Sequence, residues 1–166
     1  MSGSRPIIAL AGCLLALAAA RPARAEQVTL APAKDTTIYA EGELGNGAGT
    51  SLFTGATADL NNGAVRRALL AFDVAGSVPP GSLITGATLT LTVTMSVSGT
   101  QTVTLHRLLA DWGEGTSDAP NAEGMGTAAT TGDATWTQRM FDTAAWTTPG
   151  GDFTAAASAS ADVPDV

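Results

Sequence analysis

Three reactive residue types are almost missing from this sequence of 166 residues, which has one cysteine, one histidine and one lysine. The cysteine, Cys13, lies near the N-terminus, so the rest of the chain can form neither an internal disulfide nor a cysteine-ligated zinc site. No histidine pair, Gly-x-Ser-x-Gly motif or phosphate-binding loop occurs in the sequence. A domain of this composition depends on packing, on backbone pairing or on a bound ion for its stability.

Basic residues are also scarce, because eight Lys and Arg stand against fifteen Asp and Glu, for a net charge of −7. Three of the arginines lie in the first 25 residues, which leaves five basic residues in 26–166. Proteins that bind nucleic acid need clustered Lys and Arg to neutralise phosphates, and anionic membrane surfaces select for the same residues. The composition therefore argues against nucleic acid and against an anionic membrane surface as partners.

The longest apolar run is short and lies at the N-terminus. Arg5 supplies a positive charge, residues 7–20 are apolar, and Ala23-Arg24-Ala25 matches the small-x-small pattern that signal peptidase recognises. A run of 14 residues is shorter than the about 20 that a membrane-spanning helix needs. We therefore predict that residues 1–25 are a signal peptide. The mature chain, beginning at Glu26, is expected to be secreted and to have no transmembrane segment.

Leu10-Ala11-Gly12-Cys13 offers an alternative, because it matches the box at which lipoproteins are cleaved and acylated on cysteine. The strongest apolar stretch, residues 14–17, follows Cys13 instead of preceding it. This order favours the secreted form. Acylation of Cys13 would instead anchor the chain to a membrane.

Residues 87–98 have the clearest periodicity in the chain. Apolar side chains at the odd positions alternate with Thr or Ser at the even positions over twelve residues. This period of two predicts a strand with one buried face and one face lined by hydroxyls. The alternation resumes in 102–109 after Gly99-Thr100, so the two runs predict an antiparallel hairpin. Residues 67–73 (RALLAFD) predict a third strand that is more apolar and more central.

Shorter β-forming runs at 27–30, 36–40 and 51–54 are separated by turns rich in Gly, Pro and Asn. The expected loops are 41–50, 59–63, 78–81 and 113–132, and 155–166 is expected to be an irregular tail. Several short strands between turns are typical of an antiparallel sandwich or jelly roll. We expect residues 26–154 to form this all-β domain.

An ordered series of motifs resembles the DNRLRE domain, also classed as carbohydrate-binding module family 96. RALLAFD at 67–73 is similar to the family's R-x-L-L-x-F-D, and VPPGSLITGATLTL at 78–91 is similar to its I-P-x-G-x-x-I-x-x-A-x-L-x-L. The other matching elements, in chain order, are DTTI at 35–38, Asn46 with Gly49, LFTG at 52–55, DWGEG at 111–115 and ATW at 134–136. The resemblance as a whole covers about residues 27–153.

The resemblance implies a jelly-roll β-sandwich in an extracellular setting, often attached to larger surface or polysaccharide-processing proteins. Members of the family continue with an N-x-G-W region and with a closing strand near an Arg-Glu pair, and neither occurs before Val166. We therefore expect an incomplete sandwich with unpaired strand edges, belonging to a larger multidomain parent protein.

The candidate carbohydrate-binding residues are the three tryptophans, Trp112, Trp136 and Trp146. Sugar rings present C–H faces that stack on exposed indoles. The alternative is that the indoles fill the core, which the family-like motifs favour for Trp112 and Trp136. Trp146 lies in an expected loop and is the strongest glycan candidate of the three.

Asp35, Asn46 and Asp152 are candidate ligands of a structural Ca²⁺ ion, because calcium takes carboxylate, amide and carbonyl oxygens from Gly-rich loops. Such an ion would stabilise a domain that has no disulfides. The alternative is the ordinary turn chemistry of Asp and Asn.

Catalytic candidates are few. His106 follows Leu105 on an expected strand and is predicted to face solvent rather than to act as a general base. Asp111 and Glu114 are the one pair of carboxylates that a glycosidase mechanism could use, in a chain rich in acidic loops. We therefore predict a non-catalytic module that binds an extracellular polysaccharide, and not an enzyme. The alternative is a structural or adhesion domain without a sugar site.

Cleavage after Ala25 has a direct test. Mass spectrometry of the chain recovered outside the cells that produce it is expected to identify Glu26 as the first residue. Acylation would instead give a lipid-modified N-terminus at Cys13. Recovery of that material with Met1 still in place would contradict both forms of processing.

Overall fold

The structure, a computed structural model, describes residues 26–57 and 64–166. The predicted signal peptide with Cys13, and the predicted loop at 59–63, lie outside the described residues. Among the described residues, no helix reaches the length and the hydropathy that a membrane crossing requires.

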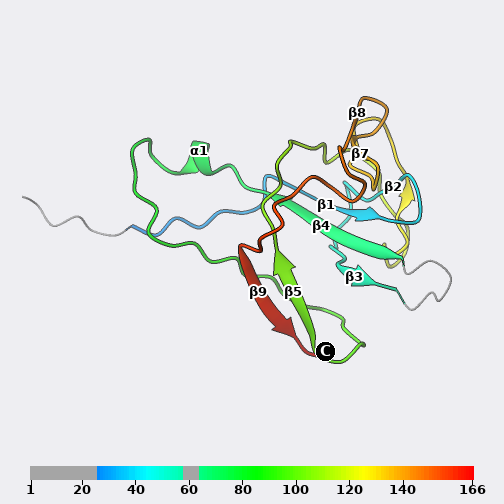
Figure 1. The fold of residues 1–166 in the computed structure, drawn as a ribbon, viewed down its shortest axis with the longest axis horizontal. Helices are drawn as coiled ribbons and strands as arrows, with labels where there is room; N and C mark the ends of the chain where they lie inside the picture. Colours follow the sequence, from blue (N-terminus) through cyan, green and yellow to red (C-terminus); the bar gives the residue numbers. More distant parts are fainter. Residues whose placement is uncertain (1–25, 58–63) are drawn as a thin grey trace, which may run out of the picture.

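Short strands make up most of the regular structure (Figure 1). Every strand pair is antiparallel. Within the described part of the chain the only helix is α1 (Val74–Ser77), where Gly76 N donates to the Asp73 carboxylate at 2.8 Å. The all-β class is therefore confirmed. The strands are β1 (Lys34–Tyr39), β2 (Leu44–Gly45), β3 (Gly55–Ala56), β4 (Val65–Ala71), β5 (Gln101–Leu105), β6 (Thr127–Ala128), β7 (Gln138–Met140), β8 (Ala144–Ala145) and β9 (Ala159–Val163).

The main sheet has the order β1–β4–β3. β4 covers most of the run predicted at 67–73 and is the middle strand, as its apolar sequence indicated. β1 pairs with it in a register that sets Thr36 opposite Leu69 and Ile38 opposite Arg67. β-branched and aromatic side chains in Thr36–Tyr39 favour this extended backbone. The expected strand at 36–40 is therefore confirmed, whereas 27–30 and 51–54 contain no assigned strand.

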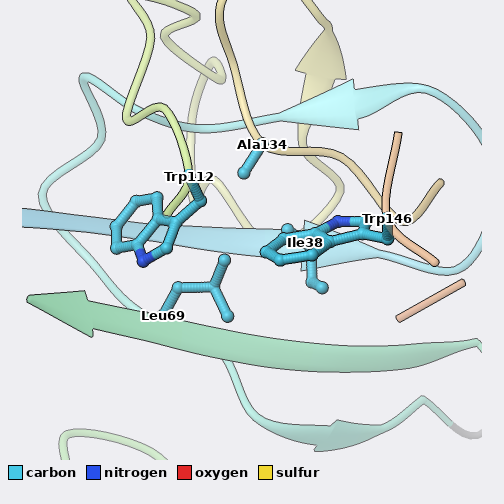
Figure 2. Packing of buried hydrophobic residues seen from close by; sticks show 5 residues of the cluster. All are labelled: Ile38, Leu69, Trp112, Ala134 and Trp146. Atoms are coloured by element: carbon cyan, nitrogen blue, oxygen red, sulfur yellow. The ribbon is translucent and has the colours of Figure 1, made fainter. Parts of the chain in front are cut away.

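The core lies on this sheet and consists of five buried hydrophobic residues (Figure 2), Ile38, Leu69, Trp112, Ala134 and Trp146. The first two come from β1 and β4. The other three come from segments between strands, so loops rather than a second long sheet cover the core. The main sheet thus has a packed apolar face, while the complete jelly-roll sandwich stays a prediction.

The predicted strand at 87–98 is the main error of the sequence analysis. The structure assigns no strand there, and the apolar side chains that were expected to face a core are exposed. Leu91 is 58% exposed and Met95 is 79% exposed. The alternation in the sequence shows that a strand formed here would have one apolar face. That face becomes buried only if another element packs against it. Among the described residues this partner is absent.

The predicted hairpin around Gly99-Thr100 is also wrong. β5 pairs with β9, in a register that sets Gln101 opposite Val163. Further upstream, Ser96 and Val166 exchange two backbone hydrogen bonds, at 3.2 and 3.5 Å. Both sides of Gly99 therefore pair with the same C-terminal segment, so the chain does not reverse there. Gly99, with a φ of 70°, lies in the irregular break between these two pairings, which suits glycine because it tolerates positive φ.

The segment predicted as an irregular tail, 155–166, contains β9. Its composition of Ala, Ser and Asp has no strand pattern, because both faces of β9 are largely exposed and no apolar row is needed. Backbone pairing with β5 forms this strand. In Figure 1 the β5–β9 ribbon stands apart from the β1–β4–β3 sheet.

Two leucines provide a matched test of the core. Leu69 is 5% exposed and Leu109 is 58% exposed. We expect Leu69→Ala to lower the free energy of unfolding by about 2–5 kcal/mol, because it removes buried methyl groups and leaves a cavity. Leu109→Ala is expected to change it by less than about 0.5 kcal/mol. Urea denaturation measures both values, and equal effects of the two substitutions would contradict the position of the core.

Candidate functional site

Two of the three candidate tryptophans belong to the core. Trp112 is 3% exposed and Trp146 is 5% exposed, and Leu69 lies between the two indoles in Figure 2. The indole N–H of Trp146 donates to the backbone oxygen of Thr135 at 3.0 Å. Trp146 therefore follows the alternative, that its indole fills the core, rather than lying exposed in a loop as a sugar platform requires. Its loop folds back because burial of the ring is favourable once the N–H has a partner.

Trp136 is only partly buried, and one face of its ring is covered by Arg67 at 4.8 Å. The same guanidinium lies 5.0 Å from the ring of Phe153, so the cation sits close to both aromatic side chains. Arg67 Nη1 also donates to the backbone oxygen of Gly150 at 2.5 Å. Burial lowers the pKa of Arg67. Cation–π contacts and the hydrogen bond thus fix the loop that carries Trp136 to β4.

His106 extends this row of side chains. Its ring meets Phe153 edge-on, with the centroids 5.3 Å apart. Its Nδ1 lies 2.9 Å from the oxygen of Thr154, and its Nε2 lies 3.1 Å from Thr104 Oγ1. The histidine follows the last residue of β5 and is half-buried, rather than standing free on a strand as predicted.

Asn46 and Glu123 form a cluster of polar contacts between loops. Asn46 is 2% exposed, donates from Nδ2 to Glu123 Oε2 at 3.1 Å, and accepts at Oδ1 from the backbone N–H of Ala119 at 2.9 Å. The Glu123 carboxylate also accepts from the N–H groups of Thr50 and Ser51 and from the Thr50 hydroxyl. A single carboxylate therefore binds together two loops more than 70 residues apart in sequence.

β1 and β4 reach the same loop as Glu123. Tyr39 is fully buried, and its hydroxyl donates to the backbone oxygen of Glu123 at 3.2 Å. Burial raises the pKa of Tyr39 to about 12. Arg66, which lies over the Tyr39 ring at 5.4 Å, donates from Nε to Gly124 O and forms an ion pair with Glu41. The loop is therefore attached to the main sheet.

Asp133 is a second organising carboxylate and is fully buried. It accepts from the backbone N–H groups of Thr116, Ser117 and Thr130. A side chain at Gly115, where φ is 75°, would collide with Oδ1 of Asp133. Ser117 continues the network, because its hydroxyl accepts from Gly47 N at 3.3 Å. These bonds give the buried oxygens of Asp133 partners, without which their burial would be costly.

The three predicted calcium ligands have different partners. Asp35 donates its backbone N–H to Glu114, and burial, followed by the Glu114 charge, raises the pKa of the Asp35 carboxyl. Asn46 belongs to the Glu123 cluster. Asp152 accepts from the N–H groups of Thr147 and Thr148, which precede it in the same loop and lower its pKa. Over 26–57 and 64–166, no group of three or more His, Cys, Asp or Glu side chains has the arrangement of a metal site.

Glu123, Asp133 and Arg67 were not among the residues predicted from the sequence. Glu123 and Arg67 bond to residues more than 70 positions away, so no local pattern could have identified them. Asp133 bonds to Thr130 in its own loop and to Thr116 and Ser117, which lie 17 and 16 residues before it. The remaining candidate pair, Asp111 and Glu114, bonds separately to Lys34 and to Asp35 N.

Comparison with models of known families, with curated proteins and with solved structures gives no match to this chain. The resemblance to the DNRLRE domain accordingly stays a prediction that rests on its motifs.

The Glu123 carboxylate makes the stability of the protein depend on pH. Hydrogen bonds from Thr50 and Asn46 hold the pKa of Glu123 below its ordinary value of 4.5. Because the folded-state pKa is lowered, the charged carboxylate stabilises the fold above that ordinary value. This contribution is lost as the pH falls through the lowered pKa.

We expect Glu123→Gln to lower the free energy of unfolding by about 1 kcal/mol at neutral pH, because an amide cannot accept all these bonds. Thermal unfolding between neutral and acid pH should show that the variant loses less stability on acidification than the native chain. Asp118→Asn, at an exposed position, is the control. An identical acid dependence of the native chain and Glu123→Gln would contradict the role of this carboxylate.

Proposed function

We propose that this chain is a non-catalytic structural or adhesion module of an exported protein, and that it joins another β-strand along residues 87–97, the alternating segment. The observation that supports this proposal is the exposure of a segment whose sequence is suited to a half-buried strand. Leu89 and Val93 are 38% and 40% exposed, and Val97 is 85% exposed. Apolar rows of this kind on a protein surface mark contact sites.

The backbone of the alternating segment supports the same proposal. Over the described residues, the backbone of 87–95 makes no hydrogen bond to another segment. Natural edge strands are protected by charges, prolines or bulges, and none of these occurs in 87–97. Addition of a strand would satisfy the backbone groups and bury the apolar row in one step. It would also supply part of the sandwich that the family resemblance implies.

Carbohydrate binding is the second candidate function. Trp136 favours it, because it is the one tryptophan that keeps part of its indole exposed, next to Arg67 and the 37%-exposed Phe153. Aromatic rings beside a guanidinium are suited to sugar faces and hydroxyls. Retardation in polysaccharide gels that Trp136→Ala abolishes would establish this function instead.

Hydrogen exchange tests the structural proposal. In the dilute purified chain, the amides of 87–95 are expected to exchange quickly, because they have no partner. In material isolated intact from the producing cells, the same amides are expected to be protected by the added strand, at least about tenfold more slowly exchanging. Mass spectrometry of peptides from both samples measures the difference.

The amides of β4 are the internal control, because they are paired within the chain and should be protected in both samples. Equal, fast exchange of 87–95 in both samples would overturn the proposal, since no strand would then have been added.

A further inference from the structure

We infer that the strand that joins the alternating segment is the same segment of a second copy of this chain, in antiparallel orientation. The inference rests on the proposed function and identifies its partner. Three features carry it: the distribution of charge, the symmetry of the alternation and the direction of the free backbone groups.

Charge restricts where two copies can meet. Residues 26–166 contain fifteen acidic and five basic residues, so most surfaces of two copies repel each other. The segment from 74 to 106 contains no Asp, Glu, Lys or Arg. Two copies can therefore approach along 87–97 without setting like charges against each other. A partner with a strongly charged strand would gain nothing from this neutral edge.

The alternation is complementary to itself. In an antiparallel pair centred on Thr92, Leu91 lies opposite Val93 and Leu89 opposite Met95 of the other copy. All apolar side chains then share one face and all hydroxyls the other, and such aliphatic and Thr–Thr pairs are favourable across strands. A shift of the pairing register by one residue would set apolar side chains of one copy opposite hydroxyls of the other. The symmetric register also pairs the whole length of 87–97.

The backbone directions agree with this register. In an extended strand, the N–H and C=O groups of alternate residues point to opposite edges. Ser96 uses both of its groups on Val166, so the odd-numbered residues direct theirs to the opposite edge. On that edge, Leu91 and Val93 form a hydrogen-bonded pair. The two copies of Thr92 then form a non-hydrogen-bonded pair, with Cα atoms about 4.5 Å apart.

Cysteine substitution tests the register. Cys13 is the one native cysteine, so full-length Cys13→Ser provides a cysteine-free background. In that background, Thr92→Cys is expected to form an intermolecular disulfide under mild oxidation, because the Cα separation fits one. Thr88→Cys is the matched control. The register puts the two copies of residue 88 eight positions apart along the strands, about 26 Å, so it should not crosslink with itself.

Sedimentation equilibrium tests the dimer without oxidation. Leu91→Lys is expected to raise the dimer dissociation constant by about tenfold or more, because it introduces charge at two symmetric points of the pair. Leu109→Lys is the control, because Leu109 has the same 58% exposure and lies outside the segment. Leu109→Lys should leave the constant unchanged.

The outcomes separate this inference from the proposed function. A native chain that is monomeric at tens of micromolar, with no preference of Thr92→Cys over Thr88→Cys for crosslinking, would overturn the second copy as partner. Protection of 87–95 in material from the cells would then still support strand addition, by a different protein. Loss of protection there as well would overturn both.

Discussion

The packing of Trp112 and Trp146 against Ile38 and Leu69 is the interaction on which the rest of the structure depends. The chain has three Trp, one Tyr and four Phe to cover its main sheet, and no long second sheet covers that face in the described residues. Two indoles take the place of several aliphatic side chains, since each ring buries a large apolar area. The same packing removes both indoles from any sugar-binding surface.

Two carboxylates organise the loops that the core does not reach. Asp133 and Glu123 accept backbone N–H groups from loops that have few apolar residues. In a domain without disulfides, such bonds stabilise loop ends that would otherwise lose pairing partners. The ion pair of Arg66 with Glu41 and the cation–π contact of Arg67 with Trp136 tie further loops to β4. Four of the five basic residues of 26–166 thus contact other segments, Lys34 and Arg139 included.

The alternating segment differs from the core, because its apolar side chains are suited to burial but no neighbouring element covers them. An exposed apolar row loses the stabilisation of burial, and an unpaired backbone edge remains open to other strands. The buried indoles and the uncharged, exposed segment are therefore complementary features of the same chain. The described chain buries two of its three indoles, whereas its alternating segment stays exposed, and the proposed function assigns this segment to a partner.

Short strands, β2 and β6, lie within the loops expected at 41–50 and 113–132, and the sequence did not predict them. The sequence by itself determined the all-β class and the position of β1 and β4. These follow from local chemistry, since β-branched and aromatic runs favour extended backbone and Gly, Pro and Asn favour turns. Only the tertiary structure decided that Trp146 is buried, that Glu123 and Asp133 organise the loops, and that β5 pairs with β9 rather than with 87–98. The physical reason is the same for Trp146, for Glu123 and for β5. Periodicity records that a face is apolar or that a group can bond, whereas the partner comes from a segment tens of residues away.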